Sequence, residues 1–168
     1  MAKILNFADF RRRIKMSEIS VFDVANAFLF FAPMTQKKLQ KLCYYTQAWN
    51  LALYDEPLFN QDFQAWIHGP VCPDLYNRYK DYGWNEIEKQ DSMPTVIVVD
   101  DNKYELISEI FRIYGGLTGD QLELLTHSEK PWQEARSGLK EWEPSNAIIS
   151  STSMREFYLD EFRRSQND

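Results

Sequence analysis

The 168-residue sequence predicts a mainly α-helical, compact domain with a small antiparallel β element inserted at roughly residues 60–102. Two observations predict this class. Apolar residues recur at helical spacing in several segments, each opened by a capping residue and closed by proline or glycine. The chain is also 44% apolar and 15% aromatic, which gives it enough surface to bury against the entropy of ordering.

Two helices are predicted before residue 56. Ser20, with Asp23 three positions later, can cap a first helix that ends at Pro33. Thr35 can cap a second and longer helix. Its apolar face is formed by Leu39, Leu42, Cys43, Thr46, Trp49 and Leu53.

The middle of the chain carries the predicted β element. Residues 63–67 alternate as a short strand does, and His68–Gly69–Pro70 is expected to form a turn. A helix should follow, with Tyr76 and Tyr79 facing inward. Thr95–Val99 is β-branched throughout and therefore predicts a second strand.

Capping signals predict the remaining helices. Two capping boxes are expected, Thr118 with Gln121 and Ser153 with Glu156. Gly115–Gly116 should end the helix before the first of them. The glycine-rich stretch around these residues is therefore interpreted as a helix end followed by a helix start, and not as a phosphate-binding loop.

Charge divides the chain into a basic leader, residues 1–20, and a domain, residues 21–168. The leader carries +3 within a total of −6, so the remainder carries −9. We expect the leader to be a solvated arm; a nucleic-acid contact is the alternative. An acidic chain is a poor general binder of nucleic acid, because phosphate contacts need a cationic surface.

The apolar run at residues 21–34 is too short and too polar to span a bilayer, so no membrane association is expected. Two cysteines are too few for a disulfide scaffold. Without a secretion signal, they are interpreted as reduced thiols of a cytoplasmic protein.

The sequence offers little chemistry. Cys43, Cys72, His68 and His127 lack the spacing of a metal site, so no metal or cofactor is predicted. His127 beside Ser128 could be a catalytic base, but neighbours on a helix end do not face each other. We expect His127 to interact with its helix dipole and Ser128 to cap the next helix, and we predict no catalytic residue.

Lysines and tryptophans are the remaining candidates for binding. Lys37, Lys38 and Lys41 form a stripe on the second helix, and we expect their stems to pack on the core with the amines in water. The aromatic content is high for a small helical core. A large aromatic core and an exposed interface are equally good explanations. The candidate partner-binding residues are Trp49, Trp84 and Trp142.

Five segments in a fixed order carry a family resemblance: Thr35–Trp49, Pro57–Phe59, Gln64–Val71, Leu75–Tyr76 and Leu125–Arg136. Their order and spacing resemble the Panacea domain, also called the SocA-like antitoxin domain. The resemblance covers about residues 21–140, and the segment before Val21 has no counterpart. Its motif positions, expected to be mostly structural, are Leu39, Lys41, Leu42, Tyr44, Tyr45, Trp66, Gly69, Pro70, His127, Pro131 and Trp132.

This resemblance implies a non-enzymatic antitoxin of bacteria and their phages. Its partner would be a cognate toxin, typically a small alarmone-synthetase type enzyme that blocks translation by pyrophosphorylating tRNA. Neutralisation would be by direct binding, in a complex that commonly holds two copies of each chain. The alternative is an adaptor that delivers its toxin to a cellular protease. Two further alternatives are a DNA-binding autoregulator using the leader and a cryptic enzyme using His127 with Glu129 or Glu134.

Overall fold

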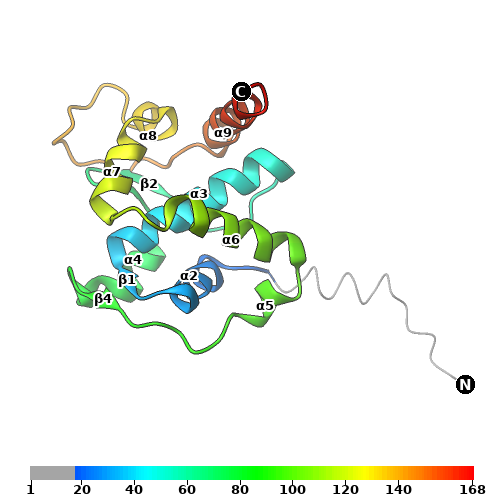
Figure 1. The fold of residues 1–168 in the computed structure, drawn as a ribbon. Coiled ribbons are helices and arrows are strands. Elements are labelled where there is room, and N and C mark those ends of the chain that lie inside the picture. The colour runs from blue at the N-terminus through cyan, green and yellow to red at the C-terminus, as the bar shows by residue number, and fades with distance from the viewer. Residues whose placement is uncertain (1–17) are drawn as a thin grey trace, which may run out of the picture.

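The computed structural model describes residues 18–168, and most of the predicted leader, residues 1–20, lies outside them (Figure 1). The helices are α2 (Val21–Phe31), α3 (Gln36–Tyr54), α4 (Pro73–Tyr79), α5 (Thr95–Val98), α6 (Asp101–Tyr114), α7 (Gly119–His127), α8 (Lys130–Ala135) and α9 (Ser151–Ser165), with a 3-10 turn η1 (Lys80–Tyr82). The short strands are β1 (Met34–Thr35), β2 (Gln64–Trp66), β3 (Gly69–Val71) and β4 (Glu86–Ile87). The predicted mainly α class is confirmed.

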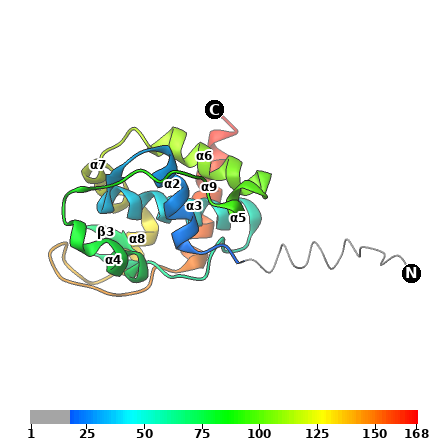
Figure 2. The same ribbon diagram turned by 90° about the horizontal axis from the view of Figure 1, so that it is seen from below.

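Helix α3 is the centre of the fold. It packs against α2, α6, α7 and α9, which surround it in Figure 1, and the view from below in Figure 2 shows α2 lying across it. As predicted, the Thr35 side chain caps α3 by accepting a hydrogen bond from the Lys38 backbone. Asp55, with φ of 55°, ends it in the left-handed conformation. Because neighbours cover α3 on several sides, even its polar residues are largely buried.

The predicted antiparallel β element consists of two small sheets. Strands β2 and β3 form a hairpin, and β1 pairs with β4 across a long sequence separation. A later segment extends the hairpin. The Ala65 amide donates to the Ala147 carbonyl and the Ile149 amide donates to the Phe63 carbonyl, both at 2.8 Å. The segment that precedes α9 is therefore hydrogen-bonded along strand β2.

The prediction of a strand at Thr95–Val99 is wrong, because Thr95–Val98 form helix α5 and Val99 is its C-cap. The amide of Val98 donates to the Pro94 carbonyl at 3.1 Å, which closes a helical turn instead of a ladder. Ile97 is fully buried whereas Val98 and Val99 are more than half exposed. No strand among residues 18–168 pairs with this segment, so burial of one side chain outweighs β propensity.

The expected turn at His68–Gly69–Pro70 is displaced towards the N-terminus. The hairpin reverses at Ile67 and His68, while Gly69 and Pro70 already belong to β3 and pair with Trp66 and Ala65. Gly69 supplies the positive φ of 102° that lets the chain leave the turn. The motif glycine thus serves the hairpin, and not a strand-to-helix connection.

Helix capping was predicted correctly at α2, α3 and α7 but not at α9. The capping boxes of Ser20 with Asp23 and of Thr118 with Gln121 are both present. The expected capping box of Ser153 with Glu156 is wrong, because Ser150 is the cap and accepts from the Ser153 amide. Ser153 instead donates its hydroxyl to Glu134 at 2.6 Å, which ties α9 to α8.

One inward-facing aromatic was also assigned wrongly. Tyr79 is buried in α4, but Tyr76 is 37% exposed and Leu75 takes the core position beside it. In a helix only one of two adjacent side chains can point straight at the core, and the aliphatic residue does so here. Within residues 18–168, no helix has the length and apolar character needed to cross a membrane.

Candidate functional site

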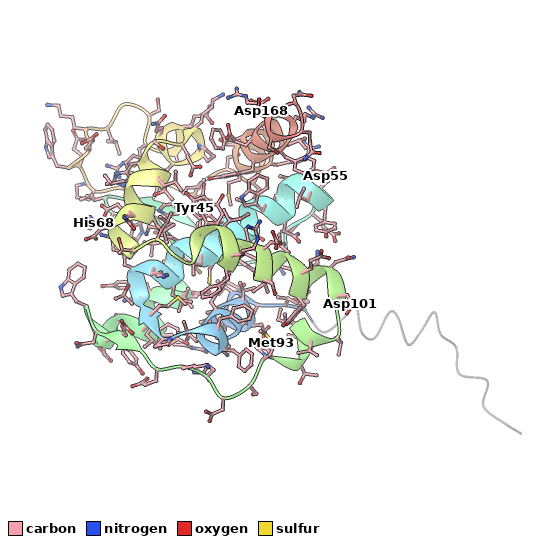
Figure 3. The ribbon with its side chains drawn as sticks, in the orientation of Figure 1. Tyr45, Asp55, His68, Met93, Asp101 and Asp168 are labelled. Atoms are coloured by element: carbon pink, nitrogen blue, oxygen red, sulfur yellow. The ribbon has the colours of Figure 1, made fainter. Side chains whose placement is uncertain are left out.

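The motif residues gather where α3 meets the β2–β3 hairpin and the α7–α8 connection. Leu39, Leu42, Tyr44 and Tyr45 are buried in the central helix. Figure 3 places Tyr45 in the middle of the molecule and His68, on the hairpin turn, at its edge. The motif thus runs from the core to one surface.

Lys41 is buried, so the expectation that its amine lies in water is wrong. The residue is 1% exposed and its Nζ donates to the Pro70 carbonyl at 3.1 Å. Burial lowers the pKa of this amine to about 7, against the attraction of Glu123. A Cβ on Gly69 would lie 2.6 Å from Lys41 Cε, so the glycine is what leaves room for the lysine stem. Lys41, Gly69 and Pro70 therefore form one packing unit.

Glu123 of α7 links α3 to the hairpin turn. Lys37 contacts both Glu123 and Asp120, and the His68 Nδ1 lies 2.7 Å from Glu123 Oε1. Burial would raise the pKa of the Glu123 carboxyl, but the hydrogen bonds from Lys37 and His68 outweigh it and lower that pKa. The amine of Lys38 is bound to the Gly115 carbonyl. Both lysines are thus held by protein acceptors.

A second carboxylate, Glu129, lies among tyrosines between α3 and α9. The hydroxyls of Tyr45 and Tyr158 donate to its Oε1 at 2.6 and 3.0 Å. Tyr45 also stacks on Tyr114, with ring centroids 4.1 Å apart. Burial raises the pKa of the Glu129 carboxyl to about 7, although both hydroxyl donors favour its charged form. This cluster holds α9 on the central helix.

His127 occupies the last turn of α7, as predicted, but its ring packs against another motif residue. It stacks on Trp132, with centroids 3.9 Å apart and planes 16° from parallel. Trp132 is 5% exposed and donates its indole N–H to the Trp66 carbonyl at 2.9 Å. Ser128 ends α7, and Glu129 is the residue that starts α8, so the expected capping role of Ser128 is wrong.

Arg136 holds the loop that follows α8. Its guanidinium is almost fully buried and donates to the carbonyls of Ala65, Lys140, Glu141 and Glu143, the last at 2.6 Å. Carbonyl oxygens thus stabilise this buried charge through Nη1 and Nη2, without a carboxylate. The same guanidinium lies over the ring of Trp132 at 4.9 Å.

The three candidate interface tryptophans differ sharply in exposure. Trp84 is 81% exposed and Trp142 is 69% exposed. Trp49 packs against the core and donates its indole N–H to the Tyr114 hydroxyl at 2.9 Å. Trp84 stands in the connection between η1 and β4, and Trp142 in the loop after α8. Both connections lie at the end of the molecule that carries His68 (Figures 1 and 3).

Two grooves flank the β2–β3 hairpin at this end. One, of about 690 Å³, lies between the hairpin and residues 144–146. The other, of about 430 Å³, lies between the hairpin, the start of α3 and η1. Trp66 and His68 line both grooves, so the hairpin is a ridge between them. We call this end of the molecule, with the hairpin, the two grooves, Trp84 and Trp142, the hairpin face.

Cys43 and Cys72 are both buried free thiols. Burial raises the pKa of each thiol, which disfavours the reactive thiolate. Across residues 18–168, no three histidine, cysteine or acidic side chains are grouped as a metal site requires.

Sequence reasoning missed the structural role of three polar residues that organise this region, Glu123, Glu129 and Arg136, and named Glu129 only as a possible partner of His127. Each is charged and each becomes partly or fully buried only because helices from distant parts of the chain meet there. Two of them could have been suspected from the sequence, because Glu129 and Arg136 lie within the motif segment 125–136.

Comparison with known proteins agrees with the resemblance in the sequence. Residues 39–133 match the model of the family described as antitoxin SocA-like, Panacea domain. Over 116 residues the chain is 28% identical to Antitoxin SocA of Caulobacter vibrioides (strain NA1000 / CB15N), an alignment that spans 63% of this chain and 62% of that protein. No solved structure matches significantly. The family match spans more than half of the chain, from the central helix to the Trp132 anchor, and the chain therefore belongs to the SocA-like antitoxin family with the Panacea domain.

Proposed function

We propose that this protein is the antitoxin of a toxin–antitoxin pair and neutralises its toxin by binding it directly, without chemistry of its own. The observation that carries the proposal is the hairpin face. Two tryptophans are exposed there: Trp84 lines one groove, and Trp142 precedes residues 144–146, which line the other. Exposed tryptophans next to concave surface are typical anchors of protein interfaces.

Charge supports the kind of toxin that the family resemblance implies. Trp84 is followed by Glu86 and Glu88, and Trp142 lies between Glu141 and Glu143. A translation-blocking enzyme that modifies tRNA needs a basic substrate cleft, and an acidic aromatic surface is steered towards such a cleft. We propose that the hairpin face covers the tRNA or nucleotide site of a small alarmone-synthetase type toxin in the cytoplasm.

The test uses the product of the neighbouring gene as the toxin. We expect co-expression to restore growth and purified antitoxin to inhibit the toxin in a tRNA-modification assay. Trp84→Ala and Trp142→Ala should each weaken binding, and the double variant should weaken it at least a hundredfold, because anchors dominate interface affinity. Val98→Ala is the matched control, since Val98 is 52% exposed on α5, away from the hairpin face.

Undiminished toxin activity at saturating antitoxin would refute the proposal. Toxin levels in cells decide between the two modes of neutralisation. A constant level with lost activity supports inhibition by binding, whereas a level that falls only when a cellular protease is present supports the adaptor alternative.

A further inference from the structure

The groove at the start of α3 combines positive charge with aromatic walls inside an acidic protein. Its volume is about 430 Å³, and the residues that define it are Lys37, Lys41, Lys80, Trp66, Tyr76 and Trp84. We call it the lysine groove. The chain carries a net charge of −6, so the grouping of three lysines around one concavity runs against the overall balance.

Two of these lysines lack a carboxylate partner. Lys37 is paired with Glu123 and Asp120. The Lys41 amine has three donors but only the Pro70 carbonyl within hydrogen-bond distance among the described residues. Lys80 is exposed at the opposite wall and forms no ion pair with any of residues 18–168. Lys80 therefore offers an unpaired positive charge to an anion, and Lys41 adds unused N–H donors beneath it.

The remaining lining specifies more than a simple anion. Trp66 and Tyr76 form an edge-to-face pair with centroids 5.1 Å apart, and Trp84 stands almost free at the rim. These rings offer apolar surface to a side-chain stem. On the floor, Gln36 is 8% exposed and its Oε1 has no hydrogen-bond partner among the described residues. A buried acceptor of this kind is stabilised by an N–H donor, which an inorganic anion does not carry.

From this combination we propose that the lysine groove receives a carboxylate-bearing peptide segment of the toxin. The carboxylate would lie between Lys80 and the deeper lysines, its aliphatic stem against Trp66 and Tyr76, and a backbone N–H towards Gln36. This inference rests on the proposed function, because the segment belongs to the toxin. It adds that an acidic segment of the toxin binds the lysine groove, although the rest of the hairpin face is acidic and complements a basic surface of the toxin.

Lys80 is the residue to change, because it is exposed and its replacement leaves the core intact. We expect Lys80→Glu to weaken toxin binding at least tenfold in calorimetric titration and Lys80→Arg to stay within threefold of wild type. Lys89→Glu is the matched control: it makes the same charge change at a position after β4, and Lys89 does not line the groove. We expect it to alter affinity less than threefold.

A charge-reversal pair identifies the occupant. In the toxin, the acidic residues are changed one at a time to lysine, and one such variant should restore binding to Lys80→Glu while weakening it to the wild type. Wild-type affinity of Lys80→Glu for the unaltered toxin would overturn the inference and leave the proposed function standing. Absence of any complex with the wild type is the separate result that rejects the proposed function itself.

A nucleotide is the other source of an anion with a planar group. Titration of ADP and GDP into the antitoxin alone tests it. Micromolar binding that is lost in Lys80→Glu, with toxin affinity unchanged, would overturn the peptide proposal. No detectable binding of either nucleotide, together with Lys80-dependent toxin binding, supports it.

Discussion

Gly69 leaves open the space that the Lys41 side chain fills. The lysine stem passes so close to the glycine that a Cβ would lie 2.6 Å from Cε, and it would also meet the Thr126 hydroxyl at 3.0 Å. Two motif positions that are far apart in the sequence are therefore explained by one contact. A side chain on Gly69 would have to displace the buried amine from the Pro70 carbonyl.

Gly69→Ala should destabilise the fold more than Gly83→Ala does. Both glycines have positive φ, 102° and 56°, so both variants carry backbone strain, but nothing lies within 4 Å of a Cβ on Gly83. We expect the free energy of unfolding to fall by about 1–2 kcal/mol for Gly83→Ala and by about 3 kcal/mol or more for Gly69→Ala. Urea titration of both variants measures the difference, and equal losses would contradict the steric explanation.

Replacement of Glu129 should change how stability depends on pH. The pKa of this carboxyl is raised from 4.5 to about 7 in the folded protein, so the folded state binds the proton more tightly than the unfolded chain. Its stabilising contribution is full below pH 4.5 and is lost as the pH rises through 7. Glu129→Gln keeps an acceptor for Tyr45 and Tyr158 and removes this loss.

We therefore expect Glu129→Gln to match the wild type near pH 4.5 and to exceed it at pH 8, by on the order of 2–3 kcal/mol. Thermal unfolding across this range provides the measurement. If the stability of the two proteins changed with pH in parallel, the Glu129 carboxyl would not be responsible for the pH dependence.

Arg136 should be essential for the loop that presents Trp142. Arg136→Ala leaves the carbonyls of Ala65 and Glu143 without their donor, and we expect a loss of about 3 kcal/mol in the free energy of unfolding. Arg136→Lys should recover only part of it, because one amine cannot reach acceptors that diverge around a planar group. In Arg136→Ala, limited proteolysis should cleave first within residues 138–146. Resistance there equal to the wild type would argue against this role.

Trp49 and Trp142 should separate stability from binding. Trp49→Phe removes the hydrogen bond to Tyr114, and we expect it to cost about 1–2 kcal/mol of stability with little effect on toxin affinity. Trp142→Ala should leave stability within about 0.5 kcal/mol and weaken toxin binding. Chemical denaturation combined with toxin titration compares the two; weaker binding by folded Trp49→Phe would make Trp49 part of the interface.

Local signals predicted the helices well because their determinants are local. Ser20, Thr35 and Thr118 each bond to the amide three residues later, as their positions suggested. Thr95–Val99 failed because its β-branched residues have strand propensity but no neighbouring strand. Propensity describes a preference, whereas pairing depends on what the rest of the chain places alongside.

The candidate site could be predicted only in its composition. The sequence showed that aromatic residues exceed a small core, but not that Trp49 is packed while Trp84 and Trp142 stand outside. The burial of Lys41 could not be predicted either, because it depends on a hairpin about thirty residues later in the chain that folds over its helix. Charged residues that enter a core do so through long-range contacts, which periodicity does not encode.

The strand-like pairing of residues 147–149 with the hairpin has a practical consequence for anyone trimming this protein. The family match stops at residue 133, yet α9 supplies Tyr158 to the central tyrosine cluster and its approach segment borders β2. A recombinant fragment that ends at residue 133 would expose Tyr44 and Tyr45 to solvent and should aggregate. Expression clones intended for crystallisation should therefore retain the chain from before Val21 to at least Ser165.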